Sequence, residues 1–473
     1  PDLVGGVNDE GRGVSGVEQS FDSLLSGEDG WILVYKDARR RTVEQVNAPG
    51  RKPVDGLDVY LTIDSRIQSI VDFELERAVE EYRAIAGISI VLDPETGDII
   101  ALSEKRREGC ADRAGRGLMS VSCIYEPGST FKLVTDAYLL ERGLVDPYDV
   151  FDTEGGECEF PFGTFRDDHR EDAWYSFKES FVKSSNVCTI KAVMGTDSRD
   201  FYRWLLDFGF GGWTGVDLPA ESRGTLREPA DWSLRSLPSI AIGQEIGVTA
   251  LQMVLAYGAL ANEGVLVAPR IALRAVDGGG TTVLETGPLA VRRIFSEETA
   301  GLMRDFCVDV VKKGTGTKAA VTGMTVAGKT GTAQKAEGGG YVEKRYVASF
   351  IGFCPADDPR LVCLVLLDEP AYPHWYGGDS AAIAFRRIIG GVNLATDMLC
   401  RSADGEVALG EAREKTVRTP SFLRLTGKDA IRLASNSGLH LSGAGEDRWT
   451  VWSQSPDPGT PIRRGGEVRL LYR

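Results

Sequence analysis

Two groups of strand-like segments, with a long helical stretch between them, constrain the fold of this chain more than any other feature. The strand-like segments lie at residues 88–93, 99–102, 326, 348–353 and 361–367. Pro94-Glu95-Thr96-Gly97 joins the first two as a hairpin turn, and the pattern from about 129 to 265 is mostly helical. Strands on either side of a helical insertion predict an antiparallel sheet flanked by helices with a large helical subdomain, an α/β (α+β) fold.

Composition divides the chain into several parts, since 473 residues are too many for one ordinary core. The expected parts are residues 1–56, residues 57–402, a polar linker at 403–418, and a small block at 419–473. The first part is glycine-rich and charged, with one strand-like stretch at 31–35, and it looks like the remnant of a larger module.

Further elements are expected at both ends of the second part and in the last. A strand at 59–63 precedes Asp64, which we expect to cap a helix that runs to about Tyr82. Another helix is expected at 380–389. The last part reads as a helix at 428–437 followed by short strands around 449–452 and 468–472.

The charge balance argues against nucleic acid as a partner. The chain has 54 Lys and Arg against 69 Asp and Glu, a formal charge of −15, whereas a nucleic-acid cleft needs a basic field. No stretch approaches the roughly 20 apolar residues that span a bilayer. The chain begins at Pro1 without a signal peptide, so we expect either a naturally soluble protein or one separated from an N-terminal anchor.

The eight cysteines show no CxxC and no zinc spacing, so we expect no metal site. Three in apolar runs are expected to act as small hydrophobes: Cys188, Cys354 and Cys363. Three in loop-like sequence could form a disulfide: Cys110, Cys123 and Cys158.

The sequence around Ser129 places a nucleophile beside a base. The Pro127-Gly128 turn leads straight into a helical pattern, so Ser129 is expected at a helix N-terminus, which favours a developing anion. Lys132, three residues on, shares its helix face. A neutral lysine there can take the hydroxyl proton, provided that burial and a second cation lower its pKa from the ordinary value of about 10.4.

This Ser-x-x-Lys pattern is not specific alone, because Ser180-Phe181-Val182-Lys183 repeats it. We interpret the second copy as an ordinary solvated helix pair. Ser129 is distinguished by the two motifs that follow it in the sequence, first Ser184-Ser185-Asn186 and then Lys329-Thr330-Gly331-Thr332. Elements of these three kinds in this order are typical of serine penicillin-recognising enzymes.

On these motifs the chain resembles class B penicillin-binding proteins, and the resemblance covers nearly its whole length. The similar stretches are Tyr125-Glu-Pro-Gly-Ser-Thr-Phe-Lys132, residues 243–252, 261–264 and 328–334, and, for the tail of the family's N-terminal pedestal, 16–18 and 25–30. Residues 419–473 resemble a PASTA domain through 451–456 and 465–468. Two departures are Ser185, where the motif has Asp, and a missing proline in 379–385.

The resemblance implies a mechanism. Ser129 attacks the penultimate D-alanine carbonyl of a stem peptide and expels the terminal D-alanine, with Lys132 as general base. Ser184 relays the proton to the leaving amine, and Asn186 holds Lys132 and the substrate amide. The substrate carboxylate is bound by Lys329, Thr330 and Thr332, and the oxyanion hole is formed by the backbone amides of Ser129 and Thr332.

The resemblance also implies a setting. The substrates are lipid II-derived peptidoglycan stem peptides, β-lactams are covalent inhibitors, and a membrane glycosyltransferase and divisome proteins are partners. The place is extracytoplasmic, in the periplasm or on the outer face of the inner membrane, with a transmembrane anchor outside this chain. The motif at 125–132 and the pedestal-like sequence at 16–18 and 25–30 favour the division-specific type of class B penicillin-binding protein. No cofactor and no metal are implied.

Other functions stay open from sequence alone. Gly323-Met-Thr-Val-Ala-Gly328-Lys329-Thr330 matches the P-loop of ATPases, although a P-loop has to open a helix and the glycines at 338–340 oppose one. A β-lactamase needs a deacylating base, for which Glu221 is the candidate. A β-lactam sensor or a cell-wall scaffold is a further alternative. Hydrolase triads are disfavoured, because there is no GxSxG and three histidines lack a recognisable partner: His169, His374 and His440.

Overall fold

The computed structural model describes most of the chain. The described residues are 2–36, 38–40, 42–43, 50–108, 117–161, 163–168, 170, 173–337, 340–396, 398–399, 416–423, 425, 427, 430, 434, 439–442, 450–458, 460–463 and 466–472.

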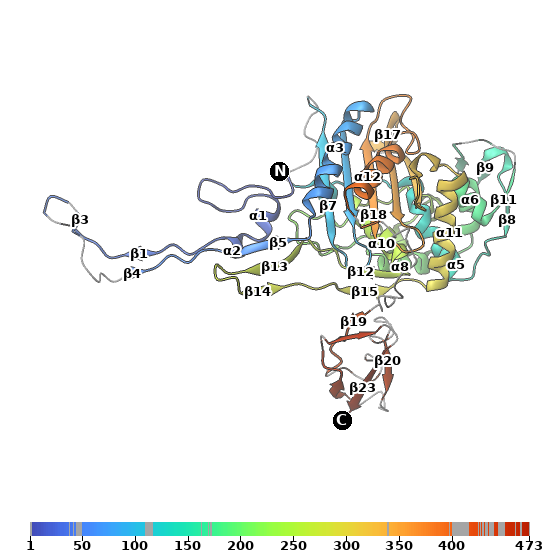
Figure 1. Cartoon of the computed structure of the whole chain (residues 1–473). Helices are drawn as coiled ribbons and strands as arrows, with labels where there is room; N and C mark the ends of the chain where they lie inside the picture. The colour runs from blue at the N-terminus through green and yellow to red at the C-terminus, as the bar shows by residue number, and fades with distance from the viewer. Residues whose placement is uncertain are drawn as a thin grey trace.

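A five-stranded antiparallel sheet is the centre of the molecule (Figure 1). Its strands are, in spatial order, β16 (Ala327–Glu337), β17 (Gly340–Cys354), β18 (Leu361–Asp368), β6 (Ala86–Leu92) and β7 (Ile99–Arg106). The sequence of β18 is apolar at seven successive positions, all of them buried, as expected for a strand covered on both faces. The predicted antiparallel sheet and the hairpin of β6 and β7 are confirmed.

Helices cover both faces of this sheet. On one face lie α3 (Ser65–Glu81) and α12 (Ala381–Ala395), which bury one side of the strands (Figure 1). The predicted cap of α3 is confirmed, since the Asp64 carboxylate accepts hydrogen bonds from the backbone amides of Arg66 and Ile67. On the other face lies α10 (Ala250–Ala261), every residue of which is buried.

The helical subdomain lies mostly between β7 and β16 in the sequence. Its helices are α4 (Met119–Ser122), α5 (Lys132–Glu141), α6 (Phe177–Lys183), α7 (Asn186–Val193), α8 (Ser198–Asp207), α9 (Ser236–Ala241), α10 and α11 (Glu297–Lys313), with 3-10 turns η1 (Gly128–Phe131), η2 (Glu154–Gly156), η3 (Pro229–Asp231) and η4 (Thr317–Ala319). Short strand pairs interrupt it: β8 (Val150–Asp152) with β11 (Trp174–Ser176), β9 (Glu157–Phe160) with β10 (Gly163–Arg166), and β12 (Val265–Val267) with β15 (Ala290–Arg293).

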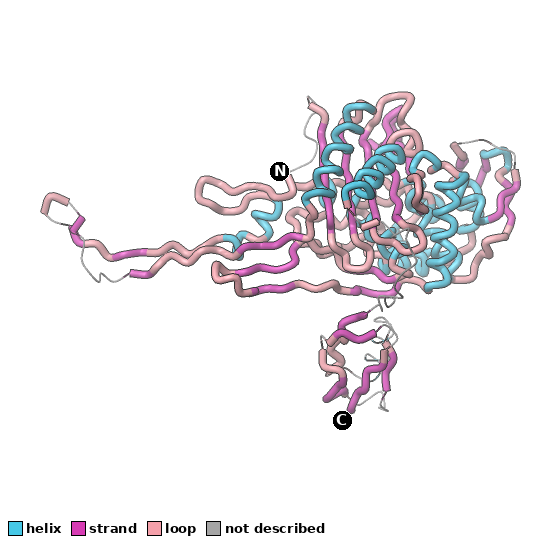
Figure 2. Tube along the Cα trace, viewed as in Figure 1, coloured by secondary structure: helices cyan, strands magenta, loops and turns pink. Residues whose placement is uncertain are grey.

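The N-terminal residues form an arm of short helices and strands, drawn mainly as loop and strand in Figure 2. Its elements are α1 (Gly16–Ser20), α2 (Asp22–Leu25), β1 (Trp31–Ile32), β2 (Tyr35–Lys36), β3 (Thr42–Val43) and β4 (Gly50–Arg51). The strand predicted at 31–35 is present as two short strands, β1 and β2, which pair with β4 and β3 along one antiparallel hairpin. β5 (Asp58–Leu61) confirms the strand predicted there and pairs with β13 (Ala272–Val276), which also pairs with β14 (Thr282–Glu285).

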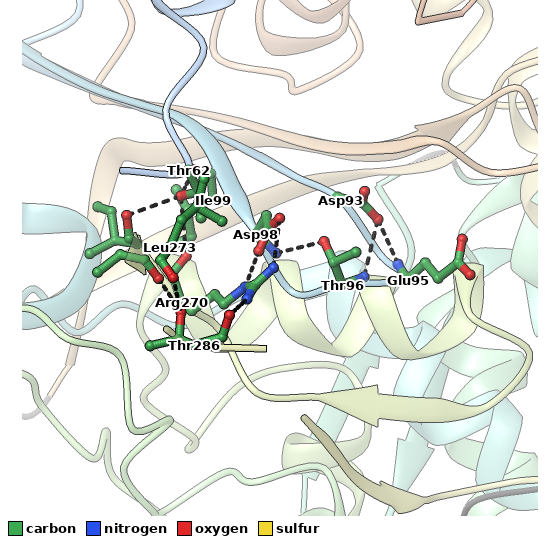
Figure 3. A network of polar contacts seen from close by, with 11 residues as sticks. Thr62, Asp93, Glu95, Thr96, Asp98, Ile99, Arg270, Leu273 and Thr286 are labelled. Atoms are coloured by element: carbon green, nitrogen blue, oxygen red, sulfur yellow. Dashed lines mark hydrogen bonds and ion pairs between the residues drawn. The ribbon is translucent and has the colours of Figure 1, made fainter. Parts of the chain in front are cut away.

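A polar network joins the β6–β7 turn to the β13–β14 hairpin (Figure 3). The Arg270 guanidinium forms an ion pair with Asp98, with Nη2 3.1 Å from Oδ2, and Nη1 donates to the Thr286 carbonyl at 2.7 Å. Thr62 Oγ1 donates to the Ile99 carbonyl at 2.6 Å. These contacts therefore join the central sheet to the three-stranded sheet of β5, β13 and β14, which lies next to the arm.

The C-terminal block has a small core of its own. Its strands are β19 (Thr416–Arg418), β20 (His440–Ser442), β21 (Val451–Ser455), β22 (Pro461–Arg463) and β23 (Glu467–Tyr472). β23 pairs parallel with β20 and antiparallel with β21, and Phe422, Val451 and Val468 are buried between them and the rest of the block. The helix predicted at 428–437 lies mostly outside the described residues.

The described cysteines are free thiols. Cys188, Cys354 and Cys363 are fully buried, which confirms their prediction as small hydrophobes. Cys123 and Cys158 are not joined to each other, so that part of the suggested disulfide pairing is wrong, and Cys110 lies outside the described residues. No helix in the described ranges is long and apolar enough to cross a membrane.

Candidate active site

A cavity of about 410 Å³ lies beside the edge strand β16. Four of the seven predicted side chains line it: Ser129, Ser184, Thr330 and Thr332. Lys132 and Lys329 lie behind Ser184 and are both fully buried, at 0% exposure. The structure thus brings together residues that are 200 positions apart in the chain.

The predicted helix start at Ser129 is present as the 3-10 turn η1, which continues into α5. Gly128 opens this turn with φ +55°, a conformation that glycine adopts without the strain of a Cβ atom. Thr130 Oγ1 donates to the Pro127 carbonyl at 2.8 Å, and the Tyr257 hydroxyl donates to the Thr130 carbonyl at 2.9 Å. These contacts fix the turn that carries Ser129.

Gly331 allows β16 to approach this turn closely. A Cβ atom at Gly331 would lie 2.9 Å from Thr130 Cγ2, 3.2 Å from the Pro127 carbonyl oxygen and 2.4 Å from Ser349 Oγ. Only a residue without a side chain therefore fits between η1 and β17. The consequence is that the backbone of the next residue, Thr332, runs beside the turn of Ser129.

Both buried lysines converge on Ser184. Lys132 Nζ donates to the Ser184 carbonyl at 2.7 Å, and Lys329 Nζ donates to Ser184 Oγ at 2.8 Å. Ser184 ends α6 in the left-handed conformation, with φ +63°, which turns its carbonyl and hydroxyl toward different lysines. The positions of both ammonium groups therefore depend on one residue.

Burial lowers the pKa of both lysines. It lowers the pKa of Lys132 to about 8, against the opposing effect of Asp167, Asp136 and Asp168. Burial and, to a smaller extent, the neighbouring Lys132 together lower the pKa of Lys329 to about 7. A substrate carboxylate beside Lys329 would favour its ammonium form and leave Lys132 as the amine of the pair.

Thr330 and Thr332 are held by hydroxyl contacts. Thr330 Oγ1 lies 2.6 Å from Thr315 Oγ1, and Thr332 Oγ1 accepts a hydrogen bond from the Gly377 amide at 3.1 Å. Thr315 also lines the cavity, with Tyr376 and Asp379 from the segment before α12. These three were not predicted, since no local motif marks them.

Asn186 lies apart from the cavity in this structure. It is the first residue of α7, and its side-chain Nδ2 donates to the Arg166 carbonyl at 2.8 Å. Its backbone amide and that of Val187 donate to Asp167 Oδ1 at 2.5 Å and 3.0 Å, while Ser185 Oγ donates to Asp167 Oδ2 at 2.8 Å. Asp167, which sequence reasoning missed, thus fixes the start of α7.

The rival interpretations find little support in the geometry. Gly328, Lys329 and Thr330 are paired residues of β16 and not the start of a helix, so the P-loop interpretation is wrong. Glu221 accepts hydrogen bonds from the backbone amides of Thr214 and Gly215 and does not line the cavity.

The second Ser-x-x-Lys copy forms no comparable pair. Ser180 Oγ donates to the Phe177 carbonyl of its own helix at 2.7 Å. Ser180 is fully buried, so its interpretation as a solvated residue is wrong, whereas Lys183 is exposed at the rim of the cavity.

Of the histidines considered for a hydrolase triad, His374 packs on the Tyr82 ring with centroids 5.1 Å apart, and His169 lies outside the described residues.

Comparisons with known proteins identify the family of this chain. The family model for the penicillin binding protein transpeptidase domain matches residues 87–390, and the PASTA domain model matches residues 417–472. Stage V sporulation protein D of Bacillus subtilis is 32% identical over 477 residues, which cover 99% of this chain and 73% of that protein. The probable peptidoglycan D,D-transpeptidase PenA of Neisseria meningitidis is 34% identical over 396 residues, 82% of this chain and 66% of that protein.

A solved structure shows the same fold. Penicillin-binding protein 3 of Mycobacterium tuberculosis, crystallised with aztreonam, superposes with a TM-score of 0.73 at 33% identity, covering 83% of this chain and 87% of that one. A serine enzyme with a buried lysine pair on this fold is a penicillin-binding enzyme of the transpeptidase class. The chain belongs to the penicillin-binding protein transpeptidase family and carries a PASTA domain, which confirms the predicted family and fold class.

Proposed function

We propose that this chain is a serine D,D-transpeptidase that cross-links peptidoglycan stem peptides through an acyl-enzyme at Ser129, and that β-lactams acylate the same serine. The observation that carries the proposal is the convergence of two buried lysines on Ser184, in the wall of the cavity that Ser129 also lines. Relatives named as peptidoglycan D,D-transpeptidases support the substrate class.

The reaction follows from the order of the groups. Lys132 Nζ, as the amine, accepts the proton of Ser129 Oγ while the oxygen bonds to the penultimate D-alanine carbonyl carbon. The C–N bond to the terminal D-alanine then breaks, and the leaving nitrogen receives a proton through Ser184. The amine of a second stem peptide then attacks the ester carbonyl carbon and loses a proton to Lys132. The bond from this carbon to Ser129 Oγ breaks, and Lys132 returns the proton to Ser129 Oγ.

The remaining predicted residues would bind and polarise the substrate. Lys329, Thr330 and Thr332 suit a carboxylate, since a buried ammonium and two hydroxyls give charge-assisted hydrogen bonds. The backbone amides of Ser129 and Thr332 suit the oxyanion hole, because Gly331 brings their segments together. Asn186 remains a proposed ligand of Lys132 and of the substrate amide, a role that needs its side chain to leave the Arg166 carbonyl.

The wider setting is also proposed. We assign residues 1–56 to a pedestal remnant, 57–402 to the transpeptidase domain, 403–418 to a linker and 419–473 to the PASTA domain. We propose septal cell-wall synthesis outside the cytoplasmic membrane, with a membrane anchor, a glycosyltransferase and divisome proteins as partners. Similarity to a sporulation protein and to penicillin-binding protein 3 supports the division type.

Labelling with a fluorescent penicillin tests the nucleophile. The wild-type protein should become covalently labelled and Ser129→Ala should not. Ser180→Ala is the matched control, since it removes the serine of the other Ser-x-x-Lys copy. Label on Ser129→Ala, or its loss from a folded Ser180→Ala protein, would contradict the assignment. Release of D-alanine from a D-Ala-D-Ala peptide, absent in Ser129→Ala, tests the reaction itself.

A further inference from the structure

Asp136 is a buried carboxyl group that the mechanism above does not use. It lies on α5 four residues after Lys132, so the two side chains share one face of the helix, one turn apart. Asp136 is 0% exposed, and neither carboxyl oxygen has a hydrogen-bond partner in the described structure. A buried carboxylate without such partners needs an opposite charge nearby to remain ionised.

Three titratable groups interact electrostatically with this carboxyl. They are Lys132 on α5, Lys329 on β16 and Cys307 on α11. Burial raises the pKa of Asp136 to about 7, and the two lysines oppose that rise. Burial also raises the pKa of the Cys307 thiol, which therefore stays neutral. Among the described groups that interact with Asp136, the two lysines are the ones that can exchange charge with it.

The proposed reaction requires this lysine pair to hold one positive charge. Two ammonium groups in a buried space repel each other, and Lys132 indeed lowers the pKa of Lys329. Two neutral amines would leave Lys329 without the charge that binds a carboxylate. A carboxylate near the pair favours the intermediate state, with one ammonium and one amine, and Asp167 and Asp168 act on Lys132 in the same direction as Asp136.

We propose that Asp136 is a positioning residue for acylation, whose carboxylate acts through Lys132 and Lys329 to keep the pair at one ammonium and one amine. The proposal rests on the proposed function, because it assigns Asp136 to the acylation of Ser129. Asp136 is not a catalytic residue, since it is fully buried and does not line the cavity.

The sign of the effect can be worked out. Ionised Asp136 raises the pKa of Lys132 and of Lys329. Asp136→Asn keeps the size of the side chain and removes the charge, so both lysines should lose their protons at lower pH. The rising limb of the acylation profile is set by the amine of Lys132, and the falling limb by the ammonium of Lys329, whose pKa the carboxylate of the bound penicillin raises. Both limbs should move down by about one pH unit.

The experiment measures the first-order rate constant of acylation at saturating fluorescent penicillin from pH 5 to 10, because that constant reports the pKa values of the complex. Asp136→Glu, which restores the charge, should return both limbs toward the wild-type positions. Thr135→Val is the matched control, because Thr135 is an equally buried polar residue of α5 whose hydroxyl donates to the Ala241 carbonyl, and its loss changes no charge. If Asp136→Asn does not fold, Asp136→Ser takes its place.

The outcomes separate the possibilities. A downward shift of both limbs in the neutral variant, with unmoved limbs in Thr135→Val, supports the proposal. A lower rate at every pH with unmoved limbs shows a merely structural role and overturns it, as does a profile of Asp136→Glu that follows Asp136→Asn. Ser129→Ala, measured in parallel, tests the proposed function separately, because label on that variant contradicts the function whatever Asp136 does.

Discussion

Gly331→Ala is the most direct test of how the site is assembled. The added methyl group would lie 2.4 Å from Ser349 Oγ of β17 and 2.9 Å from Thr130 Cγ2 of η1. Both side chains are buried, so either they have to shift or β16 has to move away from η1. Overpacking of this kind costs about 1–3 kcal/mol of unfolding free energy. On a domain of this size the midpoint of thermal unfolding should fall by about 1–2 °C for each kcal/mol.

The effect on acylation should be larger than the effect on stability. The displaced strand carries the backbone amide of Thr332, a proposed oxyanion donor, and the loss of one such donor lowers the rate about 100- to 1,000-fold. Stopped-flow acylation by a fluorescent penicillin and calorimetry measure the two quantities on the same protein. We expect acylation to fall by about two orders of magnitude while the protein remains folded.

Gly390→Ala is the matched control for this substitution. Gly390 lies inside α12, and a Cβ atom there would meet nothing within 4 Å, so alanine should stabilise the helix by about 1 kcal/mol and leave acylation unchanged. Wild-type acylation in Gly331→Ala, together with a lower unfolding temperature, would refute the reasoning that links the close approach to catalysis.

Three further predictions concern the frame, a rejected base and the pH dependence. Arg270→Ala should lower the unfolding free energy by about 2 kcal/mol, because it leaves the partly buried Asp98 without its partner; urea unfolding checks this, and an unchanged midpoint contradicts it. Glu221→Gln should leave the lifetime of the penicillin acyl-enzyme unchanged, whereas a longer lifetime would make Glu221 a deacylating base. Acylation should rise with pH through the lowered pKa of Lys132, about 8. At pH 7.5 roughly a quarter of Lys132 is then neutral, whereas about one part in a thousand would be neutral at the ordinary pKa of lysine. A rising limb near pH 10 in the acylation profile contradicts this prediction.

The strands of the central sheet were predictable because burial on both faces leaves a continuous apolar run, as in β18. The cap at Asp64 was predictable because capping is local in sequence. The break between β1 and β2 at 33–34 was not, since two short strands in succession along one hairpin carry the same composition as one longer strand. The residues of a short strand do not determine which other strand it pairs with.

The residues of the candidate active site also divide into those marked by a local motif and those that only long-range contacts bring in. Ser129, Ser184 and Lys329 were found because each belongs to a short motif whose order is informative. Asp167 was missed because its contacts to Ser185 and Asn186 span 18 and 19 positions with no local signal. Asp136 carried a signal that went unused: it is a charged residue inside an otherwise uncharged helical run, Leu133 to Leu140.

The double contact of Ser184 has a consequence for how such an enzyme can evolve resistance. Its carbonyl receives one lysine and its hydroxyl the other, from a backbone conformation that few residues adopt. A substitution at this junction alters the acylating base and the proposed carboxylate ligand at once, so selection cannot retune one of them alone. We therefore expect variants that escape β-lactams while keeping cell-wall synthesis to change the outer wall of the cavity, around Thr315 and Tyr376, and to leave the α6–α7 junction untouched.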